Sequence, residues 1–343
     1  MTNKKIVITG AAGFIGSNLT IELWKRGYSV VALDNFSLGR QDNLSSVFQQ
    51  ANQASIPPVS IIEGNITDEK KILEITKGAY AVVNIAAASA SPMFSMGNVR
   101  DAVKTNVDGF LTILKAAVQN NVAKVIYAST SSIYGNNVPP LTEDMLVVPP
   151  NMYAATKLMN EYCAALFSKD YGIETIGLRF LSIYGPNEES KGSYANLATQ
   201  FLQAMMRDEQ PVIYGDGTQT RDFTYVQDVV QAIVLALESS KKLYGEVFNV
   251  GSGASHSLNE LVHLINQLLG KQITPKYIKN PIKNYIQSQD SDITKAKTML
   301  GFTPRYSLQQ GLQEMIPTIR LDKIRRDNRI THNVDNIYMQ GKL

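Results

Sequence analysis

The segment "KIVITGAAGFIG", residues 5–16, decides the fold of this chain. Its first five residues are mostly apolar and β-branched, which predicts a short buried strand. Glycines follow at positions 10, 13 and 16, in the spacing G-x-x-G-x-x-G, where a helical pattern begins. Glycine lets backbone approach a pyrophosphate, whose charge the free N–H groups and dipole of a helix start would meet. Taken alone, the spacing also suits a simple tight turn.

The next apolar run favours the phosphate-binding interpretation. It reads "YSVVALD", residues 28–34, and ends in Asp34, where a second strand would present a carboxylate to a ribose diol. A carboxylate there accepts two hydroxyl hydrogen bonds and repels a 2′-phosphate. The sequence therefore predicts dinucleotide binding, with NAD favoured over NADP, although Arg40 nearby would suit a phosphate.

Strand and helix patterns alternate through the first half of the chain. Most of the strand patterns are continuously apolar, as expected when helices cover both faces of a parallel sheet. Strands are predicted at 5–9, 28–34, 59–64, 79–86, 124–129 and 174–180, and helices near 14–26, 68–77, 98–119 and 153–170. This alternation predicts an α/β fold, a Rossmann-type doubly wound parallel sheet.

After Phe180 longer polar loops appear, and the predicted helices lie near 193–208, 226–239, 257–269 and 307–327. We therefore expect an NAD-binding domain over residues 1–180 and a smaller mixed α/β C-terminal domain, 181–343, that binds the substrate. The run "EVFNVG", 246–251, is expected to return to the first sheet as a strand.

Bulk composition excludes several classes of function. The net charge of +3 over 343 residues is small and scattered, which argues against nucleic-acid or membrane partners. One cysteine, Cys163, excludes an internal disulfide framework and fits a reducing compartment. The three histidines show no metal-ligand spacing, so no metal is expected. No stretch reaches the roughly 18 apolar residues of a spanning helix, and the N-terminus lacks a signal pattern, so a cytoplasmic protein is expected.

Tyr153 and Lys157, in "YAATKLMNEYCAAL", lie four residues apart on one face of a predicted helix. An unperturbed phenol has a pKa of about 10. An ammonium one turn away favours the phenolate, which would make Tyr153 a proton acceptor near neutral pH. Such a pair suits the oxidation of an alcohol, because a base takes the hydroxyl proton while hydride leaves carbon. A solvent-facing Tyr/Lys pair is the alternative for this spacing alone.

Taken together, the glycine spacing, "STSSIYG" (129–135) and the Y-x-x-x-K pair resemble the extended short-chain dehydrogenase/reductase superfamily. The segments "LRFLSIYGP" (178–186), "YGDGTQTRDFTYVQDVV" (214–230), "FNVGSG" (248–253) and "SDITKAKTMLGFTP" (291–304) are similar to its NAD-dependent nucleotide-sugar epimerases and dehydratases. The resemblance covers residues 4–315 and implies a UDP-glucose/UDP-galactose 4-epimerase-like enzyme.

The resemblance implies specific roles for the catalytic residues. Tyr153 would deprotonate the C4 hydroxyl of the sugar, with Lys157 beside it, and Thr130 would hydrogen-bond the C4 oxygen. The 4,6-dehydratases of the family carry an Asp/Glu pair after the threonine, where this chain has Ser131 and Ser132, so a dehydratase is disfavoured. A net oxidoreductase or decarboxylase using the same pair is the second hypothesis. A non-catalytic dinucleotide sensor is the third, and it would be expected to lose the tyrosine or the lysine.

The binding residues that the motifs and the resemblance imply fall into two sets. For the cofactor they are Gly10, Gly13, Phe14, Ile15, Gly16, Asp34, Asn35, Phe36, Ser37, Gly39, Asn65, Ile66, Ala86, Ala87, Ala88, Asn106, Ser129, Tyr153, Lys157, Phe180 and Ile183. For the nucleotide sugar they are Ser89, Thr130, Ser131, Ser182, Tyr194, Asn196, Tyr214, Arg221, Lys283 and Tyr285, with Arg221 expected to bind phosphate unless Asp222 or Asp228 pairs with it.

Several positions depart from the family's pattern. Asn84 replaces a histidine, Asn65 an acidic residue and Ser182 an asparagine, and an arginine before "SDITKA" is absent. The last two departures leave the identity of the sugar open. The loop 86–98 would contact the sugar, and its Met93, Phe94 and Met96 suit either a lid or a packed core. The resemblance also implies a homodimer through the helices near 98–119 and 153–170, with Leu158, Met159, Tyr162 and Leu166 as its apolar face.

Overall fold

The apolar runs of the first half form a sheet of seven parallel strands in the order β11-β6-β5-β4-β1-β2-β3. The computed structural model describes residues 4–45, 59–89, 94, 98–280 and 285–319. The strands are β1 Lys5–Thr9, β2 Ser29–Asp34, β3 Val59–Glu63, β4 Ala81–Asn84, β5 Lys124–Thr130, β6 Glu174–Phe180 and β11 Glu246–Val250. The predicted doubly wound sheet is confirmed.

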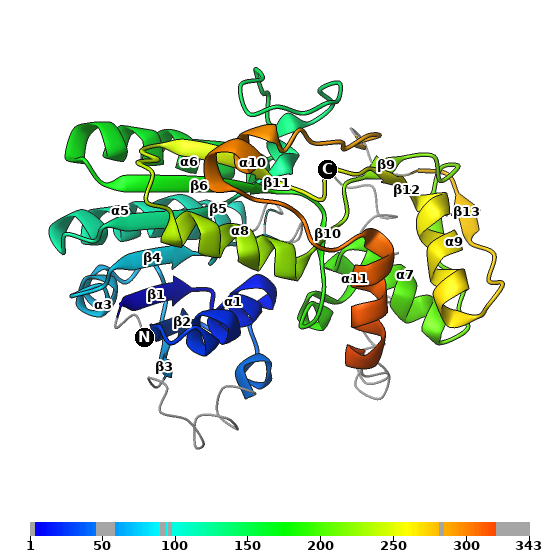
Figure 1. Cartoon of the computed structure of the whole chain (residues 1–343), viewed down its shortest axis with the longest axis horizontal. Coiled ribbons are helices and arrows are strands. Elements are labelled where there is room, and N and C mark those ends of the chain that lie inside the picture. The colour runs from blue at the N-terminus through cyan, green and yellow to red at the C-terminus, as the bar shows by residue number, and fades with distance from the viewer. Residues whose placement is uncertain (1–3, 46–58, 90–93, 95–97, 281–284, 320–343) are drawn as a thin grey trace.

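Helices cover both faces of this sheet (Figure 1). On one face α1, Phe14–Lys25, packs beside α8, Val226–Glu238, and α10, Thr294–Leu300, and their apolar side chains join one buried cluster with the strands. On the other face α3, Glu69–Ile75, α5, Gly109–Gln119, and α6, Met152–Tyr171, build a second cluster that includes Tyr127 and Cys163. Continuous apolar strands are thereby buried on both sides.

A third cluster forms at one end of the sheet (Figure 1). It holds α7 Leu197–Met206, α9 Leu258–Leu269 and α11 Leu308–Met315 against β8 Val212–Tyr214 and the 3₁₀ turn η6 Ile316–Thr318. Another 3₁₀ turn, η5 Glu189–Tyr194, precedes α7 in the chain. Short strand pairs link this part: β7 Ile183–Tyr184 with β10 Thr224–Tyr225, β9 Thr220–Arg221 with β12 His256–Ser257, and β8 with β13 Lys276–Ile278. Because α8, β11 and α10 also come from the second half, that half contributes to both parts of the molecule.

The predicted helices differ from the structure at three places. The segment 98–119 is divided into α4, Val99–Val103, a π-helical turn η3, Lys104–Asp108, and α5. The segment 193–208 becomes η5 and α7, which Ala195 and Asn196 separate. The helix predicted at 307–327 is α11 followed by η6, and residues from 320 onward lie outside the described residues.

The strand order creates a cleft at the carboxyl edge of the sheet. The chain runs outward from β1 to β3 on one side, and then from β4 to β11 on the other. The crossover connections therefore leave β1 and β4 in opposite directions, and ligands bind at this switch point in sheets of this type. No helix among the described residues has the length and apolar character that a membrane crossing demands.

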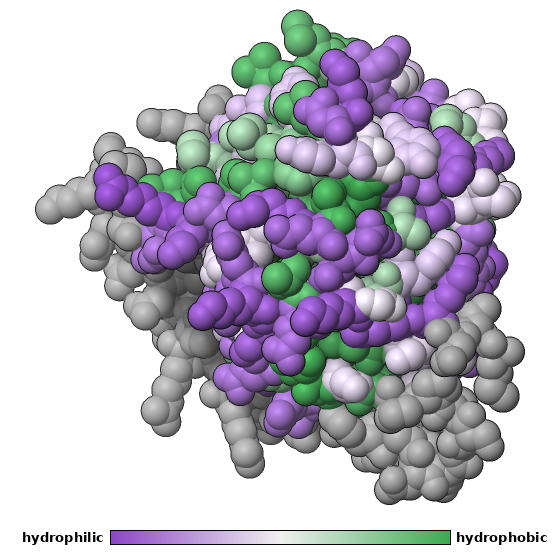
Figure 2. Space-filling model, turned by 90° about the vertical axis from the view of Figure 1, so that its left-hand side faces the viewer, coloured by the Kyte–Doolittle hydropathy of each residue, from purple (hydrophilic) through white to green (hydrophobic). Residues whose placement is uncertain are grey.

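Apolar side chains gather at the top of the face shown in Figure 2, over the loop that joins η4, Ser131–Tyr134, to α6. Val138, Leu146 and Val148 of that loop are 76–89% exposed. Beneath them Ile133, Tyr134, Leu141 and Ala154 form a small buried cluster. Polar side chains dominate the rest of the face, as expected of a surface in contact with water.

Candidate functional site

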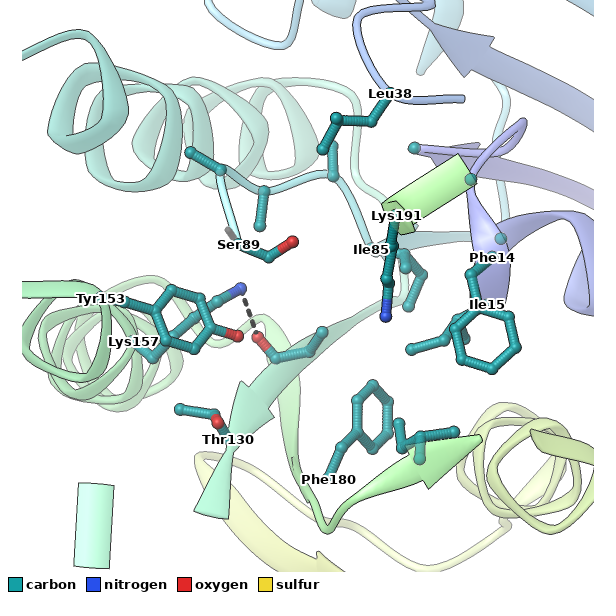
Figure 3. A pocket seen from close by; sticks show the side chains of 18 of the residues that line it. Phe14, Ile15, Leu38, Ile85, Ser89, Thr130, Tyr153, Lys157, Phe180 and Lys191 are labelled. Carbon is teal, nitrogen blue, oxygen red and sulfur yellow. Dashed lines mark hydrogen bonds between the residues drawn. The ribbon is translucent and has the colours of Figure 1, made fainter. Parts of the chain in front are cut away.

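A cavity of about 560 Å³ lies at the carboxyl edge of the sheet, between the sheet and the third cluster. It is lined by residues from both halves of the chain, and Figure 3 shows Tyr153, Lys157 and Thr130 on one flank and Phe14, Ile15 and Lys191 on the other. The predicted residues that line it are Gly10, Gly13, Phe14, Ile15, Gly16, Asp34, Asn35, Ser37, Gly39, Asn65, Ile66, Ala86, Ala87, Ala88, Ser89, Ser129, Thr130, Ser131, Tyr153, Lys157, Phe180, Ser182, Ile183, Tyr194, Asn196 and Arg221.

The glycine loop is shaped as a phosphate cradle. Gly10 has φ +69°, and a side chain there would place Cβ 2.7 Å from the Ala86 backbone nitrogen. At Gly16, Cβ would lie 2.0 Å from the Gly10 carbonyl oxygen. Gly13 caps α1, and neither a capping side chain nor a first-turn acid competes for the helix's free N–H groups. These groups and the helix dipole favour an anion at this edge of the cavity.

Asp34 closes the far end of the cradle. Its Oδ2 accepts a hydrogen bond from the Ala12 N–H at 2.8 Å, and its Oδ1 accepts one from the Phe36 N–H at 2.8 Å. Each oxygen keeps acceptor capacity for a hydroxyl of a ribose diol. A Cβ on Gly39 would lie 2.8 Å from Oδ2, so glycine keeps the approach to this carboxylate open. The cradle and the carboxylate together fit the pyrophosphate and one ribose of an NAD molecule.

Three side chains converge at the ends of β5 and α6 (Figure 3). The Thr130 hydroxyl hydrogen-bonds to the Tyr153 phenol. The Lys157 ammonium donates to the Ala128 carbonyl at 3.0 Å and lies 5.9 Å from the centroid of the Tyr153 ring. An N-cap holds the start of α6 in place, because the Asn151 side chain accepts from the Ala154 N–H.

Burial dominates the protonation of this group in the protein without ligands. It raises the pKa of Tyr153 above its ordinary value, and the Thr130 hydrogen bond opposes that rise. Burial also lowers the pKa of Lys157 to about 8. The predicted lowering of the phenol pKa by Lys157 is therefore not seen in this state, because the ammonium turns toward Ala128 and both groups are removed from water.

Ser131 and Ser182 meet through a residue that the motifs do not predict. Gln289 Oε1 accepts from the Ser182 hydroxyl at 2.9 Å, and its Nε2 donates to Ser131 Oγ at 3.4 Å. All three line the cavity. Ser182 has φ +31°, in the left-handed region where asparagine is the more usual non-glycine residue. The positive φ at this position explains why the family's pattern has an asparagine there.

Arg221 lines the cavity without an acidic partner among the described residues. Its Nη1 donates to the Thr220 carbonyl at 2.7 Å, and its guanidinium lies 5.2 Å from the Tyr285 ring. The two carboxylates that could have paired with it are occupied: Asp222 accepts from Ser252, Gly253 and Ser291, and Asp228 accepts from the Arg305 and Tyr306 N–H groups. The guanidinium is thus left for an anion in the cavity.

A second cation, Lys191, enters the cavity from η5. Its ammonium is 3.1 Å from Glu188 Oε1 and 4.7 Å from the centroid of the Phe14 ring. Glu188 is buried and also accepts from the Asn196 N–H and the Thr199 hydroxyl, so its charge stays solvated by other donors if Lys191 turns away. Neither residue carries a signal in the polar loop "NEESKG" that could have identified it.

Four predicted binding residues lie outside the cavity. The Phe36 side chain does not line the cavity. Its backbone has φ +53°, and its N–H donates a hydrogen bond to Asp34. Asn106 is buried behind the wall, where it bonds the Ala88 N–H at 2.7 Å and the Thr156 hydroxyl at 3.0 Å. Tyr214 lies on β8 away from the cavity, and Tyr285 stacks behind Arg221. A fifth, Lys283, lies outside the described residues.

The remaining lining residues are not among the predicted binding residues: Leu33, Leu38, Gly64, Ile85, Thr105, Ala128, Ser132, Glu188, Lys191, Ile286 and Gln289. Phe94 lies against Tyr153, with the two ring centroids 5.9 Å apart in an edge-to-face arrangement. Met93 and Met96, the other two residues of the predicted lid or core, lie outside the described residues.

Comparisons with known proteins agree with this geometry. The model of the NAD dependent epimerase/dehydratase family matches residues 6–251. A UDP-N-acetyl-alpha-D-glucosaminuronate decarboxylase of Bacillus cytotoxicus is 34% identical over 92% of this chain and 98% of its own. Among solved structures, the UDP-glucose 4-epimerase of Thermotoga maritima with UDP-glucose has a TM-score of 0.83 at 32% identity, covering 92% of this chain and 98% of that one. The UDP-glucuronic acid 4-epimerase of Bacillus cereus, with UDP-glucuronic acid and NAD, has a TM-score of 0.81 at 30% identity, covering 94% and 99%.

Proposed function

The chain belongs to the NAD-dependent epimerase/dehydratase family, and we propose that it interconverts the C4 epimers of a UDP-hexose. The observation that carries this function is the meeting of Thr130, Tyr153 and Lys157 in the same cavity as the glycine cradle and Asp34. One cavity thus holds a dinucleotide site and a proton acceptor beside it.

Each catalytic side chain has a task in this reaction. The bound NAD would supply the hydride acceptor for C4 of the sugar and the donor for the return of hydride to the opposite face. Tyr153 takes the proton of the C4 hydroxyl and gives it back, and the Thr130 hydroxyl holds the oxygen in line with the phenol. The Lys157 ammonium supplies positive charge beside the phenolate, which stabilises it once the proton has moved. The resulting 4-keto sugar turns over in the cavity between the two transfers.

The acidic residues of the cavity argue against dehydration. Among the described lining residues the carboxylates are Asp34, at the cradle, and Glu188, which Lys191, Asn196 and Thr199 surround. Beside Thr130 stand Ser131 and Ser132, which have no group able to donate a proton to a leaving hydroxyl at neutral pH. The elimination of water therefore lacks its acid here.

In this proposal the diphosphate of the nucleotide sugar binds Arg221. Its planar guanidinium can donate two parallel hydrogen bonds to phosphate oxygens, and it has no carboxylate partner among the described residues. Lys191 also lines the cavity and can turn from Glu188 toward the same group. The sugar would then extend toward Ser131, Gln289 and Thr130 at the other end of the cavity.

The similarity to a uronate decarboxylase makes decarboxylation the second candidate, because both reactions begin with oxidation at C4. To separate them, the purified protein is incubated with UDP-glucose, UDP-galactose and their N-acetyl and glucuronate counterparts without added reductant. We expect one or more pairs of C4 epimers to interconvert at constant mass. The products are resolved by chromatography and weighed by mass spectrometry.

A loss of carbon dioxide, of water or of two hydrogens would overturn the epimerase proposal and identify the alternative reaction directly. The bound cofactor gives a second measurement, since an epimerase regenerates it and a net oxidoreductase accumulates NADH. Heat-denatured protein with the same sugars serves as the control.

We further propose that the protein is a homodimer that pairs through α6 and α5. On α6, Met159, Tyr162 and Leu166 are 47%, 62% and 56% exposed, whereas Leu158 packs inward against the cluster around Tyr134. A Tyr162→Glu variant is expected to sediment at half the mass of the wild type, because a carboxylate in an apolar interface is costly. An unchanged mass for both proteins, whether monomer or dimer, contradicts this interface.

A cytoplasmic role in nucleotide-sugar metabolism completes the proposal. The single cysteine is a buried free thiol, which suits a reducing compartment. NAD and nucleotide sugars would meet the enzyme there, and fractionation of the host cells with an antibody against the protein tests the location.

A further inference from the structure

Two opposite charges are buried together directly beneath the catalytic residues. Arg179, on β6, donates two hydrogen bonds to Glu161, on α6: Nε to Oε1 at 3.0 Å and Nη2 to Oε2 at 2.8 Å. Arg179 is 5% and Glu161 7% exposed. Burying a charged pair costs desolvation free energy, and apolar residues could fill the same space. We therefore expect this pair to have a function beyond stability.

The pair ties the strand of Thr130 to the helix of Tyr153. Ser129, the residue before Thr130, donates its hydroxyl to Glu161 Oε1 and stands opposite Arg179 in the β5–β6 register. The remaining Arg179 nitrogen, Nη1, donates to the Tyr134 hydroxyl at 2.9 Å. Both oxygens of Glu161 therefore accept hydrogen bonds, and each of the three guanidinium nitrogens donates at least one.

Glu161 also lies one helical turn after Lys157. This i, i+4 spacing is the one at which a lysine and a glutamate pair on a helix. Yet among the described residues Lys157 bonds the Ala128 carbonyl and has no carboxylate partner. The nearest acid on its own helix face is instead held by Arg179 and Ser129.

We propose that Arg179 is a positioning residue, which holds Glu161 away from Lys157 so that the lysine's charge remains available to Tyr153. The proposal rests on the roles of Tyr153 and Lys157 given above. A carboxylate that reached Lys157 would neutralise the ammonium and would remove the charge that stabilises the phenolate. Lysine could not replace Arg179 fully, because only the planar guanidinium can engage both carboxylate oxygens at once.

Other ionisable groups face this cluster from each neighbouring element, and none of them supplies a substitute for Arg179. Tyr127, on β5, is buried beside Glu161 and Arg179, and Cys163, on α6, lies close to Tyr127. Tyr134, on η4, and Glu143, in the following loop, also lie near Arg179. Burial raises the pKa of Glu143, and the positive charge of Lys295, on α10, opposes that rise.

The first variant to test is Arg179→Met, which frees Glu161 without adding a charge. The phenol of Tyr153 is expected to titrate about one pH unit higher or more, because its neighbouring positive charge is lost. The acid limb of the pH profile of kcat should move upward by the same amount. Glu161→Gln alone removes the carboxylate, so the phenol should titrate at or below the wild-type pH. The double variant Arg179→Met/Glu161→Gln should return the phenol to within a few tenths of a unit of the wild type.

The phenol is titrated in the NAD-bound protein, because in the ligand-free protein the Lys157 ammonium faces the Ala128 carbonyl and does not lower the pKa of the phenol. The readout is the ultraviolet phenolate absorbance, taken as the difference between each variant and the same variant carrying Tyr153→Phe. This measurement needs no substrate, so it tests the positioning role even if the protein epimerises none of the sugars offered. The pH profile of kcat is the second readout. Arg26→Met, in the exposed Arg26–Glu22 pair, is the matched control and should change neither.

Arg179→Lys covers the case in which Arg179→Met does not fold. It keeps the charge but not the two parallel bonds, so it should give a smaller upward shift in the same direction. Variants that lower kcat with no movement of the phenol titration or of the pH profile would show a purely structural pair and overturn the proposal. A double variant that keeps the full shift of Arg179→Met would overturn it as well, since Glu161 would then have no part in the effect.

Discussion

A Tyr153→Phe variant is expected to lose turnover by about a thousandfold or more while it still binds NAD, because general base catalysis commonly supplies 10²- to 10⁴-fold. Phenylalanine keeps the ring and its edge contact with Phe94, so the cavity wall is preserved. What disappears is the oxygen beside Thr130, which is the proposed acceptor of the C4 proton. Steady-state turnover gives the loss, and the NAD released on denaturation gives the cofactor content.

Two further variants make this result specific. Tyr171→Phe, at an exposed tyrosine of the same helix, should leave turnover unchanged. Thr130→Val removes one hydrogen bond to the reacting oxygen and should cost about tenfold to a hundredfold, less than the loss of the base itself. If Tyr153→Phe retained activity within tenfold of the wild type, the base would have to be sought elsewhere in the cavity.

The sheet could be predicted because its signals are local. Each strand of the first half is a short apolar run bounded by turn residues, and the observed strands begin and end within about two residues of the predicted ones. The glycine loop and Asp34 follow strands directly, so the sheet topology alone brings them to one edge. Tyr153 and Lys157 share a helix face by spacing alone.

The substrate end could not be predicted in the same way, because its residues come from loops whose paths are set by tertiary packing. Gln289 reaches Ser131 from a segment 158 residues away, and Lys191 enters from a 3₁₀ turn. Tyr214 has a motif around it but lies on a strand that turns it from the cavity. Asn106 lies in the expected region, but its side chain bonds the backbone of Ala88 from behind the cavity wall.

The buried Arg179–Glu161 pair left a signal that could have been used. Arg179 interrupts the apolar part, "IGLRF", of the strand "ETIGLRF", and a charge in a strand that helices cover on both faces needs a partner. Glu161 continues the four-residue spacing of Tyr153 and Lys157 along α6. The spacing could have indicated a third polar residue on the catalytic face, but only the structure shows that it turns to Arg179.

The buried charge of Lys157 beside Tyr153 is expected to lower the free energy of unfolding. Its folded pKa is about 8 against 10.5 for the unperturbed group, so below pH 8 the amine is protonated in both the folded and the unfolded state, and the buried charge penalises the fold. At 1.36 kcal/mol per pKa unit the penalty is about 3 kcal/mol. Between pH 8 and 10.5 the unfolded chain binds the extra proton, so stability rises with pH, and the penalty is gone above that range.

A Lys157→Met variant is therefore expected to be more stable than the wild type at pH 7, although it should turn over at least a hundredfold more slowly. The lost hydrogen bond to the Ala128 carbonyl offsets about 1 kcal/mol of the gain, which leaves a rise of a few degrees in Tm. Because the penalty vanishes as the wild-type lysine deprotonates, the difference in Tm should shrink as the pH rises from 8 to 10.5. Scanning calorimetry across this range measures it, and Lys115→Met, at an exposed lysine paired with Glu69, should show no such trend.

A variant less stable than the wild type at every pH would mean that the ammonium supports the fold. The charge beside Tyr153 would then carry no cost in stability that catalysis has to justify.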